Sequence, residues 1–261
     1  MTDSSYRTSI GHSDAESITV LGHDLASDLI GRISFGELAF WLVAMRRPSP
    51  GELRVFEAVL VALADHGLTP SAIASRLTLT GAPESVQGAL AAGILGGGSR
   101  FLGVTEDCGR FLASSLAAHD GALPHDDAGW DALALGAVRR QRDAGHHVPG
   151  LGHPVHKGGD PRTPVIIAVA ADAGLRGPHL QLFEAIGRVH PAVLGRTLPL
   201  NGAGVCGAAL ADLGFPPDTL RGFALLARTA GLLGHIAEEQ RRPVGMAVYD
   251  HVDRSTEYLR P

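Results

Sequence analysis

The stretch TLRGFALLARTAGLLGHIAEEQRR, residues 219–242, decides the fold class. Its apolar residues recur every three or four positions, a spacing that places them on one face of an α-helix. Asp218 precedes the run and Pro243 follows it, which predicts one long helix between them. The side chains expected on its buried face are Leu220, Phe223, Ala227, Ala230 and Leu233.

Helix start signals recur elsewhere in the chain. Ser34 with Glu37 fits a capping box, and Ser49 with Glu52 repeats the signal with a proline at the first helical position. Period-two alternation is rare, and the only strand-like run is PVIIAVAA, residues 164–171. The chain is therefore predicted to be essentially all-α.

The composition is that of an ordinary globular protein. The chain has 261 residues, 45% hydrophobic and 19% charged, enough for one large domain or two unequal ones. A net charge of −5 with no basic run gives no attraction for nucleic acid. The two cysteines suggest no disulfide framework, and neither the polar N-terminus nor any later window fits a signal peptide or a membrane span. We expect a cytoplasmic protein.

Titratable and cationic groups gather among glycines and prolines in HVPGLGHPVHKGGDPRTP, residues 147–164. This segment admits three interpretations: a metal site, an anion-binding and proton-transfer site, or a solvated loop. The histidines here lack the i, i+4 spacing of a helical metal pair, and a single carboxylate accompanies them, so no metal is expected. They are His147, His153 and His156, with His146 directly before the segment and Asp160 as the carboxylate.

A second glycine-rich segment, NGAGVCG at 201–207, contains a formal G-x-G-x-x-G at Gly202, Gly204 and Gly207. A dinucleotide site would need a strand before the motif and, after the following helix, a second strand ending in an acidic residue. The next segment is instead predicted to be a long helix. A glycine-rich junction between helices is the better interpretation.

Two further residues are ambiguous when taken alone. His66 follows an apolar helix, where a histidine can simply interact with the helix dipole. Arg228 lies mid-helix among apolar residues, where an arginine is costly unless it meets an anion or a carboxylate. His235 lies two turns later on roughly the same face. For Arg228, an internal salt bridge is the alternative to binding a ligand.

Taken in order, four stretches resemble the citrate synthase family. They are ALADHGLTPSAIASR (62–76), GLGHPVHKGGDPR (150–162), ARTAGLLGHIAEEQ (227–240) and RRP (241–243). The second matches the family's G-x-G-H-x-V-x-K-x-x-D-P-R signature in register. The chain looks most like the short citryl-CoA lyases and the C-terminal synthase-like module of ATP-citrate lyase, and the resemblance covers nearly the whole chain from about Ile18.

The resemblance implies roles for individual residues. His66 would bind the oxaloacetate or citrate part of the substrate, and His153 would lie within reach of its hydroxyl or carbonyl oxygen. Histidine suits proton transfer near neutral pH, and the planar fork of arginine suits carboxylates. The implied carboxylate ligands are Arg162, Arg228 and Arg242, with Lys157 near the phosphates of CoA. His156 matches no catalytic position of the family.

The resemblance also implies a fold and an assembly. We expect the two-lobed, all-α citrate synthase type, with a large lobe of residues 1–108 and 213–261 and a small lobe of residues 109–212. The active site would lie in the cleft between the lobes. A homodimer is implied, with Arg242 reaching into the neighbouring subunit's site. A CoA thioester is the expected co-substrate, and no permanently bound cofactor, metal, nucleic acid or membrane is expected.

Two positions depart from the family pattern. In GSRFLG, residues 98–103, Phe101 stands where citrate synthases have a histidine; the ATP-citrate lyase module is phenylalanine-like there, which favours lyase chemistry. In NGAG, residues 201–204, Ala203 occupies the place of the family's catalytic aspartate, and alanine carries no exchangeable proton. A shift of the match by two residues would place Asn201 there instead. Asp212 lies roughly 2.5 turns further along the helix, too far to replace the aspartate.

Three functions are compatible with these departures. The first is retro-Claisen cleavage of a 3-hydroxy polycarboxylate acyl-CoA to a 2-oxo acid and an acyl-CoA, with water or another residue as proton donor. The second is cleavage or decarboxylation of a di- or tricarboxylate without CoA. The third is binding of a polycarboxylate without turnover. The retained His153 favours chemistry, because a pure binding protein has no use for a proton-transfer group.

Overall fold

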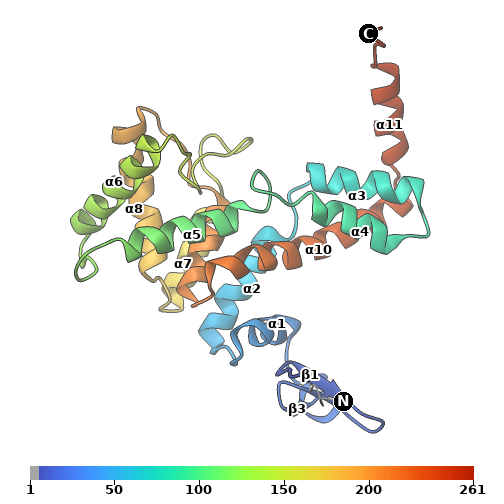
Figure 1. The fold of residues 1–261 in the computed structure, drawn as a ribbon, viewed down its shortest axis with the longest axis horizontal. Helices are drawn as coiled ribbons and strands as arrows, with labels where there is room; N and C mark the ends of the chain where they lie inside the picture. Colours follow the sequence, from blue (N-terminus) through green and yellow to red (C-terminus); the bar gives the residue numbers. More distant parts are fainter. Residues whose placement is uncertain (1–5) are drawn as a thin grey trace, which may run out of the picture.

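The computed structural model describes residues 6–261 and is mainly helical (Figure 1). A small antiparallel sheet opens it, in the order β1 (Gly11–Ser13), β2 (Ile18–Val20) and β3 (His23–Asp24), followed by a short π-helix, η1 (Leu25–Leu29). The sequence did not reveal this sheet because its strands are too short to show alternation. Residues 1–5, part of the polar N-terminus and of the expected large lobe, lie outside the described residues.

The rest of the described chain is built from α-helices, which confirms the all-α prediction for the body of the protein. They are α1 (Phe35–Ala44), α2 (Pro50–Ala64), α3 (Pro70–Gly81), α4 (Val86–Leu95), α5 (Val104–Ala117), α6 (Asp127–Asp143), α7 (Arg162–Asp172), α8 (Pro178–Leu194), α9 (Gly202–Asp212), α10 (Pro217–Arg241) and α11 (Gly245–Arg254). Within residues 6–261, no helix has both the length and the apolar character needed to cross a membrane.

The helix starts follow the local capping signals. Ser49 accepts a hydrogen bond from the backbone N–H of Glu52 at 3.2 Å, and the Glu52 carboxylate accepts one from the Ser49 N–H at 2.8 Å. Ser34 makes only the first half of this arrangement, accepting from the Glu37 N–H. The strand-like run 164–171 is helical and lies in α7, in agreement with the all-α prediction. Helical packing against α2 and α9 overrides the β preference of its branched residues there.

Helix α10 is the longest helix described and contacts four others. It packs against α5 and α2 along its first part and against α3 and α4 further on (Figure 1). Its predicted buried face is correct over the first half, but Ala230 and Leu233 are exposed. Because the packing partners change along the helix, the buried face rotates. In the second half of α10 the buried residues are Arg228, Leu232, Ile236 and Glu239.

The large hydrophobic core joins α1, α2 and α10 through a cluster of phenylalanines. Phe215 lies 4.5 Å from Phe223 and 4.8 Å from Phe40 between ring centroids, and Phe56 lies 5.0 Å from Phe223. All four side chains are buried. Such aromatic packing makes the base of α2 rigid, and the loop that follows α2 carries His66.

The glycines of NGAGVCG serve helix packing, as the sequence interpretation had it. A Cβ on Gly204 would lie 2.6 Å from the Gly150 Cα, and one on Gly207 would collide with the carbonyl oxygen of Thr105 in α5. Helix α9 therefore packs backbone to backbone against α5 and the histidine-rich loop. In the part of the chain that the structure describes, α10 follows α9 and no second strand completes a dinucleotide motif.

Gly207→Ala is expected to lower the free energy of unfolding by about 1–3 kcal/mol, because the added methyl group meets backbone atoms that cannot move independently. Gly234→Ala is the matched control: a Cβ there has nothing within 4 Å, so it should be neutral or stabilise α10 by up to about 1 kcal/mol. Chemical denaturation of the two variants measures the difference. Equal stabilities would contradict the close α5–α9 crossing.

Candidate active site

A cavity of about 750 Å³ lies where three connecting segments and the starts of two helices meet the middle of α10. Its walls come from the loop after α2, the segment before α5, the loop 147–155, and the first turns of α7 and α9. The predicted site residues that line it are His66, Phe101, His153, Arg162, Asn201, Ala203 and Arg228. Lys157 and Arg242 are exposed and do not line the cavity within this single chain.

His66 lies in a loop rather than at a helix end. Helix α2 ends at Ala64, and Asp65 already has extended backbone angles, so the helix-dipole interpretation of His66 is wrong. Its ring centroid is 5.2 Å from that of His153. Within residues 6–261 no hydrogen bond to the His66 imidazole is present, so both of its nitrogens are available to a ligand.

The protonation state of His153 is set by its own loop. Its Nδ1 accepts hydrogen bonds from the backbone N–H groups of Val155, at 3.1 Å, and His156, at 3.0 Å. The single ring proton of the neutral imidazole must then be on Nε2. Burial lowers the pKa of His153, and the nearby His156 adds to the effect. His153 is therefore a neutral hydrogen-bond donor through Nε2.

His156 completes a cluster that the sequence did not predict. Its ring centroid is 4.4 Å from that of His153 and 5.4 Å from that of His66, and one ligand atom of each lies within 4.8 Å of the others. A metal-bound histidine ordinarily donates a proton through its second ring nitrogen. Since His153 Nδ1 accepts instead, this cluster suits an oxygen-rich ligand better than a metal ion.

Arg228 is the strongest anion-binding feature of the cavity. Its side chain is buried in α10, and among the described residues its Nε and Nη1 have no hydrogen-bond partner. The Asp65 carboxylate lies 3.8 Å from Nη1, an ion contact but not a hydrogen bond. Burial lowers the pKa of Arg228. Two buried guanidinium nitrogens that face a cavity without an acceptor indicate a site for a ligand carboxylate.

Arg162 is held in place by Asp160. The Asp160 carboxylate accepts from Arg162 Nε at 3.0 Å and Nη2 at 2.7 Å, and from the Gly202 N–H at the start of α9 at 2.7 Å. Burial opposes ionisation of Asp160, but these donors outweigh it and hold its pKa well below the usual range. Arg162 also donates from Nη1 to the Ala62 carbonyl oxygen. Three of the roughly five N–H groups of a guanidinium are thus used, leaving two for a ligand.

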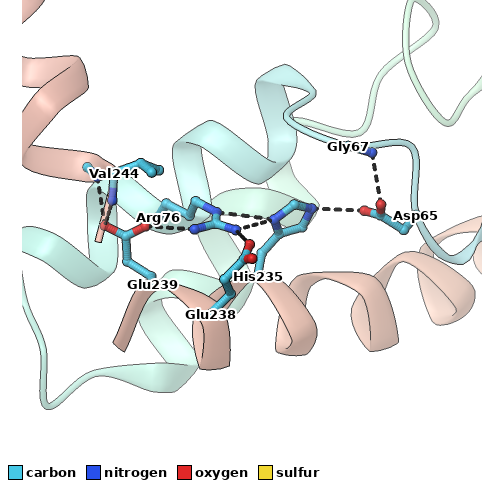
Figure 2. A network of polar contacts seen from close by, with 8 residues as sticks. Asp65, Gly67, Arg76, His235, Glu238, Glu239 and Val244 are labelled. Atoms are coloured by element: carbon cyan, nitrogen blue, oxygen red, sulfur yellow. Dashed lines mark hydrogen bonds and ion pairs between the residues drawn. The ribbon is translucent and has the colours of Figure 1, made fainter. Parts of the chain in front are cut away.

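A partly buried polar network holds the Asp65 carboxylate in place (Figure 2). Arg76 donates to His235 Nδ1 at 3.1 Å, which fixes the ring proton on Nε2, and that nitrogen donates to Asp65 at 2.9 Å. Burial would raise the pKa of Asp65, but the Gly67 N–H and His235 outweigh it, so the pKa is lowered. Arg76 also pairs with Glu238 and, at 2.9 Å, with Glu239. Asp65 is thereby kept ionised between Arg228 and His66.

The positions at which the sequence departs from the citrate synthase pattern all line the cavity. Ala203 lies in the first turn of α9, and Phe101 precedes α5. Asn201 caps α9 by accepting from the Gly204 N–H at 2.8 Å and donates from Nδ2 to the Gly152 carbonyl oxygen at 2.8 Å. The oxygen and the nitrogen of the Asn201 side-chain amide are thus both engaged in hydrogen bonds to the backbone. Asp212 is bound to the start of α8 through the His179 and Leu180 N–H groups.

Asp107, in the first turns of α5, is a further residue of the cavity that the sequence did not predict. Among residues 6–261 it is the only carboxylate that lines the cavity. No motif marked it, because its place in the cavity depends on how α5 crosses α9.

The chain matches the sequence profile described as Citrate synthase, C-terminal domain, over residues 6–246. It belongs to the citrate synthase family. The structure of this family member superposes on citryl-CoA lyase from Hydrogenobacter thermophilus with a TM-score of 0.85 at 28% identity, covering 98% of this chain and 95% of that one. The family prediction and the citrate synthase-like fold are confirmed.

Other relatives of this family member are longer proteins. ATP citrate lyase from Methanothrix soehngenii, solved in complex with citrate and coenzyme A, gives a TM-score of 0.77 at 22% identity over 100% of this chain and 42% of that one. A probable ATP-citrate synthase of Caenorhabditis elegans is 24% identical over 98% of this chain and 24% of its own length. 2-Methylcitrate synthase 1 of Corynebacterium glutamicum is 28% identical over 73% of this chain and 47% of its own length. The chain thus spans about a quarter to a half of these curated relatives.

Proposed function

We propose that this chain is a carbon–carbon lyase of the citryl-CoA lyase type, cleaving a 3-hydroxy polycarboxylate acyl-CoA to a 2-oxo acid and an acyl-CoA. The observation that carries the proposal is the buried Arg228 guanidinium without a hydrogen-bond partner among residues 6–261, in one cavity with Arg162 and the Nε2–H of His153. The likeness to citryl-CoA lyase, over almost the full length of both chains, supports it.

In the proposed reaction the two arginines bind the substrate and the two histidines act at its C3 oxygen. Arg162 and Arg228 each hold one substrate carboxylate, and His153 donates its Nε2–H to the oxygen at C3. His66 accepts the hydroxyl proton. The bond between C3 and the α-carbon of the thioester then breaks, its electron pair forms the thioester enolate, and C3 becomes the carbonyl of the 2-oxo acid. The enolate carbon must finally receive a proton.

CoA acts in this proposal as a co-substrate that leaves with the acyl product. The ATP citrate lyase complex with citrate and coenzyme A supports a CoA-dependent reaction. Phe101, Leu102 and Ala203 give the cavity apolar lining that suits the thioester end of the substrate. The exposed Lys157, in the loop that carries His153, is available for the CoA phosphates.

Cleavage or decarboxylation of a free di- or tricarboxylate is the second candidate. Ala203 favours it, because the family's usual agent of proton transfer at the acyl carbon is missing there. A substrate without a thioester would leave the apolar end of the cavity, around Phe101, unused.

The two candidates are distinguished by their products. Incubation with citryl-CoA should give acetyl-CoA and oxaloacetate in equal amounts, measured by mass spectrometry. His153→Ala should slow this reaction about 10²–10³-fold, the usual contribution of one hydrogen-bond donor to an oxygen on which negative charge develops. Consumption of free citrate with citryl-CoA left intact would overturn the lyase proposal in favour of the second candidate.

We also propose that the site is shared between two subunits. Arg242 ends α10 in an exposed position outside the cavity of its own chain, which leaves it available to a neighbouring copy. Mixing Arg242→Ala with His153→Ala subunits should restore up to about a quarter of the activity, because random pairing makes half the molecules mixed and each mixed dimer carries one intact site. No recovery in mixed dimers shown to form would contradict the shared site.

We further propose that residues 1–108 and 213–261 form a large lobe and residues 109–212 a small lobe. The proposed boundary at residue 108 falls inside α5, and residue 212 ends α9. Closure of residues 109–212 over the substrate would exclude water from the enolate. Small-angle scattering should then show a smaller radius of gyration with citrate and CoA present. An unchanged radius under saturating ligand would contradict closure.

A further inference from the structure

The proposed lyase reaction leaves one step without an agent. When the carbon–carbon bond breaks, the enolate carbon needs a proton, and Ala203 has none to give. Asp160, Asp65 and Asp212 are each engaged by several donors and do not line the cavity. If a carboxylic acid supplies this proton, it must come from another element of the cavity wall.

Asp107 lies on such an element. It shares the cavity wall with Ala203 and Phe101, and it is the only carboxylate there among residues 6–261. Helix α5 lies directly against α9, which carries Ala203: a Cβ on Gly109 of α5 would lie 3.4 Å from the carbonyl oxygen of Gly207. The backbone crossing therefore brings the first turns of the two helices to the same end of the cavity.

The charges around Asp107 leave its carboxyl loosely held. The adjacent Glu106 takes the close ion pairs, with Arg110 at 2.8 Å and Arg221 at 2.9 Å. Asp107 has only a 3.7 Å contact with Arg221. His147 and Arg100 are further titratable or charged residues in the lining of the cavity.

The protonation of Asp107 suits an acid. Burial raises its pKa; the negative charge of Glu106 adds to this, while Arg221 and Arg110 oppose it. A carboxyl group that retains its proton more readily than usual can donate it to a carbanion.

We propose that Asp107 is the catalytic acid that protonates the acyl α-carbon, replacing the aspartate absent at position 203. This rests on the lyase function proposed above. The hydroxyl proton goes to His66, the electron pair of the broken bond forms the enolate, and Asp107 transfers its proton to that carbon. Acetyl-CoA and the Asp107 carboxylate result. Water returns the proton from His66 to Asp107, so no oxidant or further reactant is needed. In the reverse direction Asp107 is the base that removes a proton from the acetyl methyl group.

The test compares Asp107→Asn with Glu106→Gln, its neighbour outside the cavity wall. Asp107→Asn should lower kcat for citryl-CoA cleavage about 10²–10⁴-fold while citrate affinity, measured by titration calorimetry, stays the same. Glu106→Gln should keep kcat within about tenfold of the unmodified protein, and Asp107→Glu should recover part of the loss. In D₂O, deuterium incorporation into the acetyl-CoA methyl group with oxaloacetate present should fall in Asp107→Asn alone.

The other possible results separate the role of Asp107 from the lyase function itself. If the unmodified protein cleaves citryl-CoA and Asp107→Asn does so at a similar rate, Asp107 is not the acid and the lyase function stands. An equal loss in Glu106→Gln would show a general charge effect and overturn the assignment. If Asp107→Asn does not fold, the unmodified enzyme still decides: its kcat for cleavage must fall as pH rises through the raised pKa of this acid, and a flat profile overturns the role. Failure of the unmodified protein to cleave citryl-CoA would remove the lyase function itself.

Discussion

Replacing Arg228 by methionine is expected to stabilise the ligand-free protein and at the same time to weaken polycarboxylate binding strongly. Two nitrogens of the buried guanidinium, Nε and Nη1, have no hydrogen-bond partner among residues 6–261, and the Asp65 carboxylate lies 3.8 Å from Nη1. Removing a poorly compensated buried charge and filling its volume with an apolar side chain should raise the free energy of unfolding by about 1–3 kcal/mol. Loss of a buried charge-assisted contact to the ligand should weaken citrate binding about 10²-fold or more.

The two effects are measured together by thermal unfolding with and without citrate. The unmodified protein should gain stability as citrate is added, because a ligand that binds only the folded state shifts the equilibrium toward it. Arg228→Met should start from a higher Tm and show no citrate dependence. Arg54→Met, which removes an exposed arginine of α2 paired with Asp172 at the surface, is the control and should leave citrate dependence intact. A lower Tm for Arg228→Met would show that Arg228 stabilises the fold.

Asp160→Asn is expected to damage both the fold and the site. The buried carboxylate holds Arg162 through two hydrogen bonds and caps α9 through Gly202. The amide cannot accept at both oxygen positions and leaves Arg162 without its counter-charge. Breaking a buried pair in this way should lower the free energy of unfolding by about 3–5 kcal/mol.

The pH dependence of stability gives an independent reading of the same residue. The pKa of Asp160 is lower in the folded state than its ordinary value of 3.8, so its contribution is complete above that value and is lost as pH falls through the folded-state pKa. The stability difference between the unmodified protein and Asp160→Asn should therefore shrink below about pH 4. Asp126→Asn, at an exposed helix cap where asparagine serves equally well, should show no such difference. A gap that stays constant down to low pH would contradict the assignment.

The features that sequence predicts well here are local ones. The Ser49–Glu52 cap depends on residues three apart and is present as predicted. The glycines of 201–207 were assigned to helix packing because no second strand was expected, and the α5–α9 crossing agrees. His66, His153 and Arg228 come from distant parts of the chain, and only the family resemblance gave reason to expect them in one cavity.

The features that sequence could not show depend on the packing of distant elements. Asp107 carries no motif, and its role in the wall follows from the crossing of α5 over α9. The tautomer of His153 follows from two backbone N–H groups of its own loop, which no residue pattern reveals. The rotation of the α10 buried face reflects its change of packing partners from α2 and α5 to α3 and α4.

Lyase function in a chain without the family's aspartate is tested most directly by measuring citryl-CoA cleavage. The rate of the unmodified protein is compared with the rate of the Ala203→Asp variant. If the cavity supplies its own proton donor, the unmodified protein should release acetyl-CoA and oxaloacetate at a rate within about tenfold of the variant, since one acid then substitutes for the other. Cleavage by Ala203→Asp alone would contradict this and show a citrate-type cavity diverted to substrates without a thioester.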